Sequence, residues 1–132
     1  AADKLAVNVH SCVNASAQYA ALEALNGPQD CVTIMNNAFK IRSKIMFEEL
    51  NKLDLISCKN PQGAFYCFPN ISKLNFSSLD FQNKLLEVAG VAAIAGTSFG
   101  EFGEGFLRFS CASSEESIKR AIDKLSLFLS NI

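Results

Sequence analysis

The segment Gly103-Glu-Gly-Phe-Leu-Arg-Phe-Ser110 places one arginine among apolar residues directly after a glycine-rich turn. Side chains alternate along an extended chain, so Phe106, Arg108 and Ser110 share one face and the apolar residues between them share the other. A charge on such a strand requires a partner, because an unpaired buried ion is costly. The segment therefore predicts a strand with one apolar face and one face built around Arg108.

Composition narrows the class of protein. The chain has 132 residues, of which 49% are hydrophobic, enough for one folded domain with a core. Lys plus Arg number 12 and Asp plus Glu 13, so neither nucleic acid nor a membrane surface is expected as a partner. No apolar run approaches the roughly 18 residues that span a bilayer, and the N-terminus lacks the pattern of a secretory signal. We expect a soluble protein.

Metal chemistry is not indicated by the cysteines or the histidine. The chain has five cysteines: Cys12, Cys31, Cys58, Cys67 and Cys111. No Cys-x-x-Cys pair is present, and a zinc site needs three or four converging ligands. The only histidine, His10, has no partner at a readable spacing, so a structural or surface role is favoured over that of a base or ligand. We predict reduced, structural cysteines and a cytoplasmic location.

The first third of the chain is predicted to be helical. Ala15–Leu25 is rich in alanine and leucine, and Asn26-Gly27-Pro28 ends this helix and begins the next, with a left-handed glycine as the stop. From Asp30 to Leu53 the apolar residues recur at helical spacing with charged residues between them. This pattern predicts a long amphipathic helix.

After Asp54 the pattern changes to short strands. Four runs have strand character: Leu55–Lys59, Gly63–Pro69, Val91–Ala95 and Phe106–Cys111. Pro61-Gln62-Gly63 is typical of a turn between the first two runs. A short helix is predicted to begin at a cap formed by Ser77 or Ser78 and to be closed by Gly90.

The C-terminal segment predicts a second amphipathic helix. Ser113-Ser114-Glu115-Glu116 has the serine and glutamate of a capping box. The apolar stripe of the helix comprises Ile118, Ala121, Ile122, Leu125, Phe128, Leu129 and Ile132. The order of elements predicts an α/β or α+β layered fold, with a small mixed sheet covered by helices. Without a repeat or linker, residues 1–132 are expected to form a single domain.

The residues alone leave the function open. No P-loop, dinucleotide-binding turn or nucleophile elbow is present. The glycine-rich segment Gly96–Gly105 is either a flexible connection between strands, the simpler interpretation, or a loop that lets a ligand approach the backbone and reach Arg108. Arg108 itself is as readily assigned to an ion pair with Glu101 or Glu104 as to a ligand.

Three segments, in order, carry a family resemblance: Ser11–Leu25, Pro61–Phe68 and Val91–Ala112. They resemble a Gln-x-Ala-x-x-x-Ala-Leu helix, a Pro-x-Gly-Ala-Phe-Tyr strand and the C-terminal arginine signature of the class I/II, fold-type I aminotransferases, which use pyridoxal phosphate. The similarity covers nearly the whole chain. It is greatest to the aspartate and aromatic aminotransferase branch.

The resemblance implies roles for particular residues. Arg108 would clamp the α-carboxylate of an amino-acid substrate, since a guanidinium grips a carboxylate at two points. Phe65 and Phe99 would wall the substrate side of the site. Ser11–Asn14 would lie near the dimer interface. The family's Pro-Gly is Ala95-Gly96 here, so the start of the loop is expected to be more mobile.

The resemblance also implies that this chain is the C-terminal small domain of such an enzyme, without the cofactor-binding large domain. None of its lysines lies in the family's Ser-x-x-Lys motif: Lys4, Lys40, Lys44, Lys52, Lys59, Lys73, Lys84, Lys119 and Lys124. We therefore expect no catalytic residue here, no bound pyridoxal phosphate, and no activity of the chain alone. The full-length protein is expected to be a cytoplasmic homodimer that transfers an amino group between an amino acid and a 2-oxo acid.

Two alternatives stay open at this point. The chain could be a stand-alone module that binds small carboxylates through Arg108, although its start inside a helix and without methionine favours a fragment. It could also belong to a fold-type I relative that performs decarboxylation, β-elimination or acyl transfer. The side chain of the substrate is not predicted, because in this family much of the specificity comes from the large domain and the partner subunit.

Overall fold

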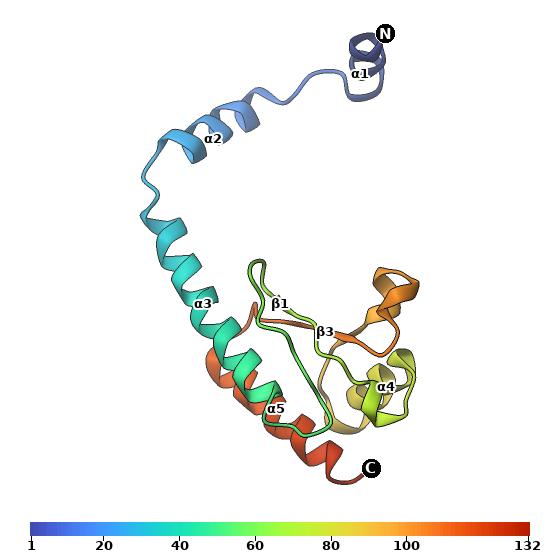
Figure 1. Cartoon of the computed structure of the whole chain (residues 1–132). Helices are drawn as coiled ribbons and strands as arrows, with labels where there is room; N and C mark the ends of the chain where they lie inside the picture. Colours follow the sequence, from blue (N-terminus) through green and yellow to red (C-terminus); the bar gives the residue numbers. More distant parts are fainter. The chain divides into compact units, whose positions relative to one another are not determined.

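The structure is a computed structural model that describes residues 1–132, and the chain divides into two compact units, Ala1–Met35 and Asn36–Ile132. Helices α1 (Ala2–His10) and α2 (Ala15–Asn26) belong to the first unit (Figure 1). The long helix α3 (Asp30–Leu50) begins in it and continues into the second. No residue of the first unit is buried.

Helices α2 and α3 confirm the predicted helical first third, with differences at their ends. Gly27 ends α2 with φ −74°, an extended conformation, so the left-handed stop that we predicted is wrong. A side chain there would clash with the backbone carbonyl of Glu23, to which the Gly27 N–H donates a hydrogen bond, so glycine is required for close approach. Helix α3 ends at Leu50, three residues before the predicted Leu53.

The second unit contains a three-stranded sheet of β1 (Tyr66–Cys67), β2 (Ile94–Ala95) and β3 (Leu107–Ser110), in the order β1-β3-β2. Strand β3 is central and pairs antiparallel with both neighbours, so the sheet is antiparallel throughout instead of mixed. Helix α4 (Ser78–Lys84), the π-helical turn η2 (Leu85–Ala89) and α5 (Glu115–Leu129) complete the unit. The layered α/β fold is confirmed.

The first predicted strand is absent from the fold. In the run 55–59, only Ser57 pairs with another chain segment, through an isolated bridge to Asn70. The side chain of Asn51 accounts for the difference, because it accepts the Cys58 N–H and donates to the Cys58 carbonyl, both at 3.0 Å. A backbone satisfied by a side chain needs no partner strand.

Serine side chains begin both helices of the second unit. Ser77 is the cap of α4 and accepts the Asp80 N–H at 3.1 Å, and Gly90, with φ 64°, closes the η2 turn as predicted. Helix α5 is capped by Ser114, which accepts the Ser117 N–H at 3.1 Å. The predicted capping box from Ser113 to Glu116 is therefore wrong, because the cap lies one residue later.

The core lies between the sheet and the three helices. Helix α3 contributes Met46 and Leu50, and α5 contributes four of the predicted apolar residues: Ile118, Ile122, Leu125 and Phe128. Phe81 of α4 packs against Phe128 with ring centroids 5.6 Å apart. Figure 1 shows the second half of α3 beside α5. Ile132 follows the end of α5 and is exposed, so it does not extend the stripe.

The five free cysteines fall into two groups. Cys58, Cys67 and Cys111 are buried, as predicted for structural residues, whereas Cys12 and Cys31 are exposed. Hydrogen bonds with Cys111 and then Cys58, together with burial, raise the pKa of Cys67. The buried thiols therefore behave as core groups.

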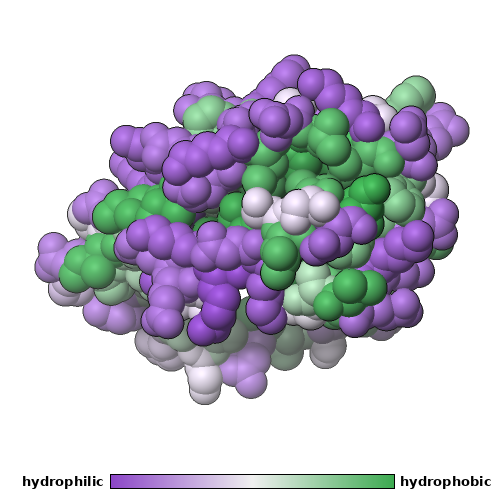
Figure 2. Space-filling view, turned by 90° about the horizontal axis from the view of Figure 1, so that it is seen from below, coloured by the Kyte–Doolittle hydropathy of each residue, from purple (hydrophilic) through white to green (hydrophobic).

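One face of the molecule carries both apolar and hydrophilic residues (Figure 2). Figure 2 shows apolar patches, in green, set among hydrophilic groups on one face. No helix has the length and hydropathy needed to cross a membrane.

Candidate carboxylate-binding site

Arg108 lies at the centre of the sheet, because β3 is the middle strand and Arg108 pairs in register with Ile94 of β2. Its neighbours Leu107 and Phe109 are buried, while the Arg108 side chain is half-buried on the opposite face. The predicted alternation of β3 is confirmed. The strand fixes the backbone of the arginine and leaves its side chain on the face away from the core.

Two aromatic rings hold the guanidinium of Arg108. Its central carbon lies 4.2 Å from the ring centroid of Tyr66 and 4.2 Å from that of Phe99. Such contacts are electrostatically favourable, because the ring face carries negative charge. They also leave the N–H donors at the edge of the guanidinium plane without a partner.

No carboxylate of the chain pairs with Arg108. The three ion pairs of the chain lie on α3 and α5 or beside their ends: Lys44–Glu48, Lys52–Glu49 and Arg120–Glu116. The predicted alternatives, ion pairs of Arg108 with Glu101 or Glu104, are absent. The guanidinium is held by aromatic rings and has no carboxylate partner in the chain.

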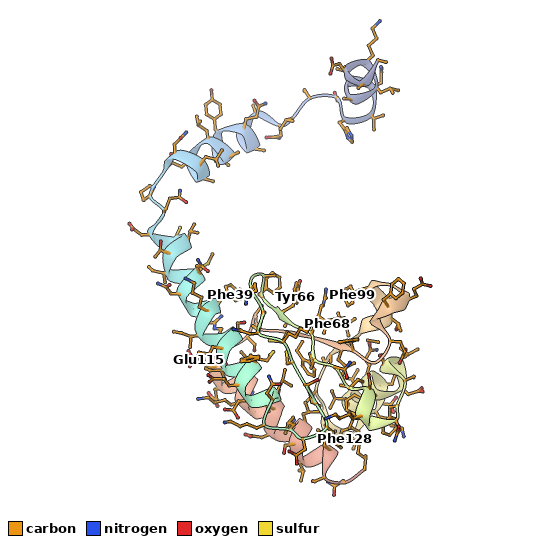
Figure 3. The ribbon with its side chains drawn as sticks, in the orientation of Figure 1. Phe39, Tyr66, Phe68, Phe99, Glu115 and Phe128 are labelled. Carbon is orange, nitrogen blue, oxygen red and sulfur yellow. The ribbon has the colours of Figure 1, made fainter.

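Further aromatic side chains extend this surface, which we call the aromatic face: Tyr66, Phe68, Phe99 and Phe106. Phe68 stacks on Phe106 with centroids 5.3 Å apart and meets Phe99 edge-on at 6.3 Å. Figure 3 shows Tyr66, Phe68 and Phe99 on one side of the compact unit, away from Phe128. The surface is apolar apart from the arginine.

The two phenylalanines expected beside the substrate lie differently. Phe99 contacts Arg108 directly, whereas Phe65 packs on Tyr66 at 4.2 Å and on Phe39 at 5.8 Å. Phe65 is thus linked to Arg108 only through Tyr66. The wall role of both residues stays a prediction.

A cavity of about 520 Å³ opens beside the aromatic face. Tyr66, Phe68 and Phe106 form its apolar wall, and Lys59 and Asn70 supply polar groups. Most of its lining is apolar, as in many small-molecule sites. The Arg108 guanidinium packs on the ring of Tyr66, and Tyr66 also lines this cavity, so the two form one continuous surface.

The glycine-rich loop Gly96–Gly105 is folded into two 3₁₀ turns, η3 (Gly96–Phe99) and η4 (Glu101–Gly103). A side chain on Gly96 would clash with the carbonyl oxygen of Gly103, so the two glycines let the ends of the loop meet. The Gly96 N–H then donates to the Phe106 carbonyl at 2.8 Å. The loop brings Phe99 back over the sheet.

Hydrogen bonds join this loop to the start of α4. Oε1 of Glu104 accepts the Ser78 N–H at 2.8 Å and the Gly105 N–H at 3.2 Å. The bond from the Ser78 backbone is the largest cause that lowers the pKa of Glu104, against opposing desolvation and the charge of Asp80. The carboxylate of Glu104 is therefore hydrogen-bonded at the start of α4 and does not pair with Arg108.

The lysines of this chain lie at its surface. Every lysine of the chain is exposed, and none contacts the aromatic face except Lys59 at the rim of the cavity. No group of three or more histidine, cysteine, aspartate or glutamate side chains has metal-binding geometry.

Several residues of the site were missed by the sequence interpretation. Tyr66 lies on β1 and Phe68 directly follows it, and the pairing of β1 with β3 sets Tyr66 beside Arg108. Alternation along the run 63–69 was readable, but the pairing of β1 with β3 was not. The contact of Ser78 with Glu104 spans 26 residues and has no local signal.

Comparison with known proteins identifies the family of the chain. The profile of the family "Aminotransferase class I and II" matches residues 2–125. The chain is 40% identical over 119 residues to the probable N-acetyl-LL-diaminopimelate aminotransferase of Bacillus subtilis, covering 90% of this chain and 30% of that protein. It is 40% identical over 124 residues to the aspartate aminotransferase of Pyrococcus horikoshii, covering 92% and 32%.

A solved structure extends the likeness to three dimensions. The alanine aminotransferase of Pyrococcus furiosus superposes with a TM-score of 0.92 at 32% identity, covering 98% of this chain and 33% of that one. The chain thus spans about a third of the length of its relatives. Members of this family generally use pyridoxal phosphate. The antiparallel sheet with its unpaired arginine, the matched profile and the shared fold agree, and the chain belongs to the class I and II aminotransferases.

Proposed function

We propose that the full-length protein is a pyridoxal-phosphate-dependent aminotransferase in which Arg108 binds the α-carboxylate of the amino-acid or 2-oxo-acid substrate. One observation carries the proposal: the guanidinium lies 4.2 Å from the centroids of two aromatic rings and forms no ion pair. A charge kept apart from every carboxylate of the chain is suited to an anion from outside.

The physical chemistry of arginine supports this role. The planar guanidinium offers a fork of donors that matches a carboxylate at two points. The rings of Tyr66 and Phe99 restrict the rotation of the side chain, so less conformational entropy is lost when the carboxylate binds. A substrate held at two points has a defined orientation for reaction.

We further propose that residues 1–132 are the C-terminal part of the enzyme and that the large domain carries the cofactor. The exposed lysines of this chain support the division. On this basis the chain alone does not catalyse transamination. Reading the coding sequence upstream of Ala1 tests the point, and an in-frame extension with a Ser-x-x-Lys motif is expected. A start codon immediately before Ala1 would instead favour a stand-alone carboxylate-binding module.

Kinetics of the full-length protein test the role of Arg108. We expect Arg108→Leu to lower kcat/KM for transamination by on the order of 100- to 1000-fold, because two charge-assisted hydrogen bonds worth about 3 to 4 kcal/mol together are lost. Arg108→Lys should retain part of the wild-type kcat/KM, because lysine keeps the positive charge but lacks the paired donors of the guanidinium. The steady-state rate with an amino acid and a 2-oxo acid is the measurement.

A matched control is available on α3. Arg42 also lies over an aromatic ring, 5.7 Å from the centroid of Phe39, but does not line the aromatic face or its cavity. Arg42→Leu should leave kcat/KM within about twofold of the wild type, as for a surface substitution. Equal kinetics of the Arg108 and Arg42 variants would contradict the proposed role.

The oligomeric state and location are proposals of the same kind. A homodimer is supported by the apolar residues left exposed on α1 and α2, such as Leu5 and Leu25. The cytoplasm is supported by the free state of all five cysteines. Sedimentation of the full-length protein and cell fractionation test the two statements, and a monomer or a membrane-enclosed compartment would contradict them.

A further inference from the structure

The hydroxyl of Ser78 connects α4 to the start of β3. Ser78 has 0% exposure, and it is the only polar or charged residue in the buried core. Its Oγ accepts the N–H of Gly105 at 2.8 Å and of Phe106 at 3.2 Å. It donates to Oε1 of Glu104 at 3.2 Å. These bonds use the one donor and both acceptor sites of a hydroxyl.

Glu104 completes the connection from the other side. Its Oε1 receives the backbone N–H of Ser78 at 2.8 Å, and its own neighbour Gly105 donates to both Oε1 and the Ser78 hydroxyl. We call Ser78 and Glu104 the latch. The latch closes on itself, since each of the two residues bonds the other and both bond Gly105.

The hydroxyl of Ser78 is not the cap of the helix that it begins. The cap of α4 is Ser77, whose Oγ accepts the Asp80 N–H and bonds the Asp80 carboxylate at 2.7 Å. The Ser78 hydroxyl therefore forms all of its hydrogen bonds with residues 104–106, which are 26 to 28 positions away in the sequence. Its role concerns the loop and β3.

The bonded residues adjoin the site on both sides. The N–H of Phe106 donates a hydrogen bond to the Ser78 hydroxyl. Phe106 is two residues before Arg108 and stacks on Phe68 in the aromatic face. On the other side, Glu104 and Gly105 end the loop that carries Phe99. The far end of the loop is set by the close approach of Gly96 to Gly103. The loop held at these ends carries the Phe99 ring over the guanidinium.

We propose that Ser78 and Glu104 are positioning residues, which hold the loop so that the Phe99 ring packs on Arg108 and its N–H donors face the substrate carboxylate. The functional half of this statement rests on the proposed role of Arg108. The structural half, the dependence of the Phe99–Arg108 contact on the latch, stands without it. The experiment separates the two.

The structural half is tested by NMR of the 132-residue chain without ligand. In the wild type, nuclear Overhauser effects are expected from the Arg108 side chain to both the Tyr66 and the Phe99 rings, which lie equally close. Ser78→Ala and Glu104→Ala should lose the effect to Phe99 and keep the one to Tyr66, because Tyr66 lies on β1 and not on the loop. Glu104 is exposed, so its variant tests the latch even if Ser78→Ala fails to fold.

Two further variants separate positioning from general stability. Ser77→Ala removes the adjacent cap and should lower stability while both Overhauser effects remain. Glu104→Gln keeps an oxygen acceptor for the same donors and should restore the contact that Glu104→Ala loses. Retention of the Phe99–Arg108 effect in Glu104→Ala, or its loss in Ser77→Ala, would overturn the latch.

The functional half is tested by titrating each variant with 2-oxoglutarate and following the Arg108 Nε–H resonance. Glu104→Ala should weaken binding on the order of tenfold or more, and Glu104→Gln should recover it. If the Overhauser effect is lost but the affinity is unchanged, the positioning role is overturned. Binding to Arg108→Leu, which lacks this resonance, is followed through the backbone N–H resonances of β3, which are recorded for the wild type as well. If the wild type and Arg108→Leu bind 2-oxoglutarate equally, the proposed role of Arg108 fails, and the positioning role that rests on it fails as well, while the Overhauser result still decides whether the latch holds Phe99.

Discussion

At the scale of single residues, the environment of Arg108 decides what its charge can do. An arginine beside a glutamate is a structural ion pair, whereas Arg108 lies between Tyr66 and Phe99 without a carboxylate partner, which in the proposed function keeps its donors for a ligand. Glu104 is near in sequence but is bound to Ser78. Whether Arg108 forms an ion pair within the chain therefore depends on the hydrogen bonds of the Glu104 carboxylate.

The cysteines provide a prediction at the same scale. Two thiols of the five, Cys12 and Cys31, should react rapidly with a coloured disulfide reagent, because they are exposed. The other three should react only after unfolding, because they are buried. The pKa of Cys67 is also raised, whereas hydrogen bonds with Cys67 lower the pKa of Cys58 and Cys111, so these two are protected by burial alone. Stopped-flow absorbance measures the number of thiols that react rapidly and the number that react only after unfolding.

The control for this prediction is Cys12→Ser, which should remove one rapid equivalent and leave the slow phase unchanged. Rapid reaction of three or more thiols in the wild type would show that the core opens under native conditions. That result would contradict the burial on which the prediction depends.

At the scale of elements, the junction of β2 with the glycine-rich loop shows how the chain replaces a proline. The resemblance predicted a more mobile loop start, because Ala95 stands where the family has proline. In the structure Ala95 has φ −57°, within the range that proline imposes, and its N–H donates to Oε1 of Gln82 at 2.7 Å. A hydrogen bond to α4 thus holds the backbone where a ring would.

Ala95→Pro is consequently expected to destabilise the chain by about 1 kcal/mol, although the backbone angle suits proline, because it removes a hydrogen-bonded N–H. On a Gln82→Ala background the same change should cost less, since the bond is already lost. Urea unfolding of the four proteins of this double-mutant cycle measures the difference. Stabilisation by Ala95→Pro on the wild-type background would contradict the importance of the Gln82 bond.

At the scale of the whole molecule, the two compact units differ in how they are stabilised. Residues 36–132 contain every buried side chain, and Ala1–Met35 contains none. The first unit exposes large apolar groups, among them Leu25 at 81% and Val9 at 71%. Helices without a buried face gain little from packing, and short isolated helices are marginal in water.

Deletion of residues 1–35 is therefore expected to change the free energy of unfolding by less than about 0.5 kcal/mol. By contrast, Leu50→Ala in the shortened chain should cost about 2 to 5 kcal/mol, because Leu50 is fully buried. Urea unfolding followed by circular dichroism compares the three proteins. A large loss of stability on deletion would mean that the first unit contributes to the core.

Local interactions explain which parts of this fold were readable from the sequence. Helices α2, α3 and α5 follow from apolar spacing and from caps within a few residues, and the two faces of β3 follow from alternation. The cap of α5 lies one residue after the predicted one, because Ser113 and Ser114 are both suited to that position, and the end of α3 lies three residues before the predicted one, because helix ends are weakly fixed by local sequence. The run 55–59 was mistaken for a strand, since its hydrogen bonds go to the side chain of Asn51, outside the run.

The sequence by itself determined the layered class of the fold, the two-faced strand that carries Arg108, and the resemblance to the aminotransferase family. Only the tertiary structure decided that Arg108 is unpaired, that Tyr66 and Phe99 enclose it, and that Ser78 reaches across 26 residues to occupy Glu104. The physical reason is range. Periodicity and capping act over a few residues, whereas strand pairing and side-chain hydrogen bonds join positions that only the folded chain brings together.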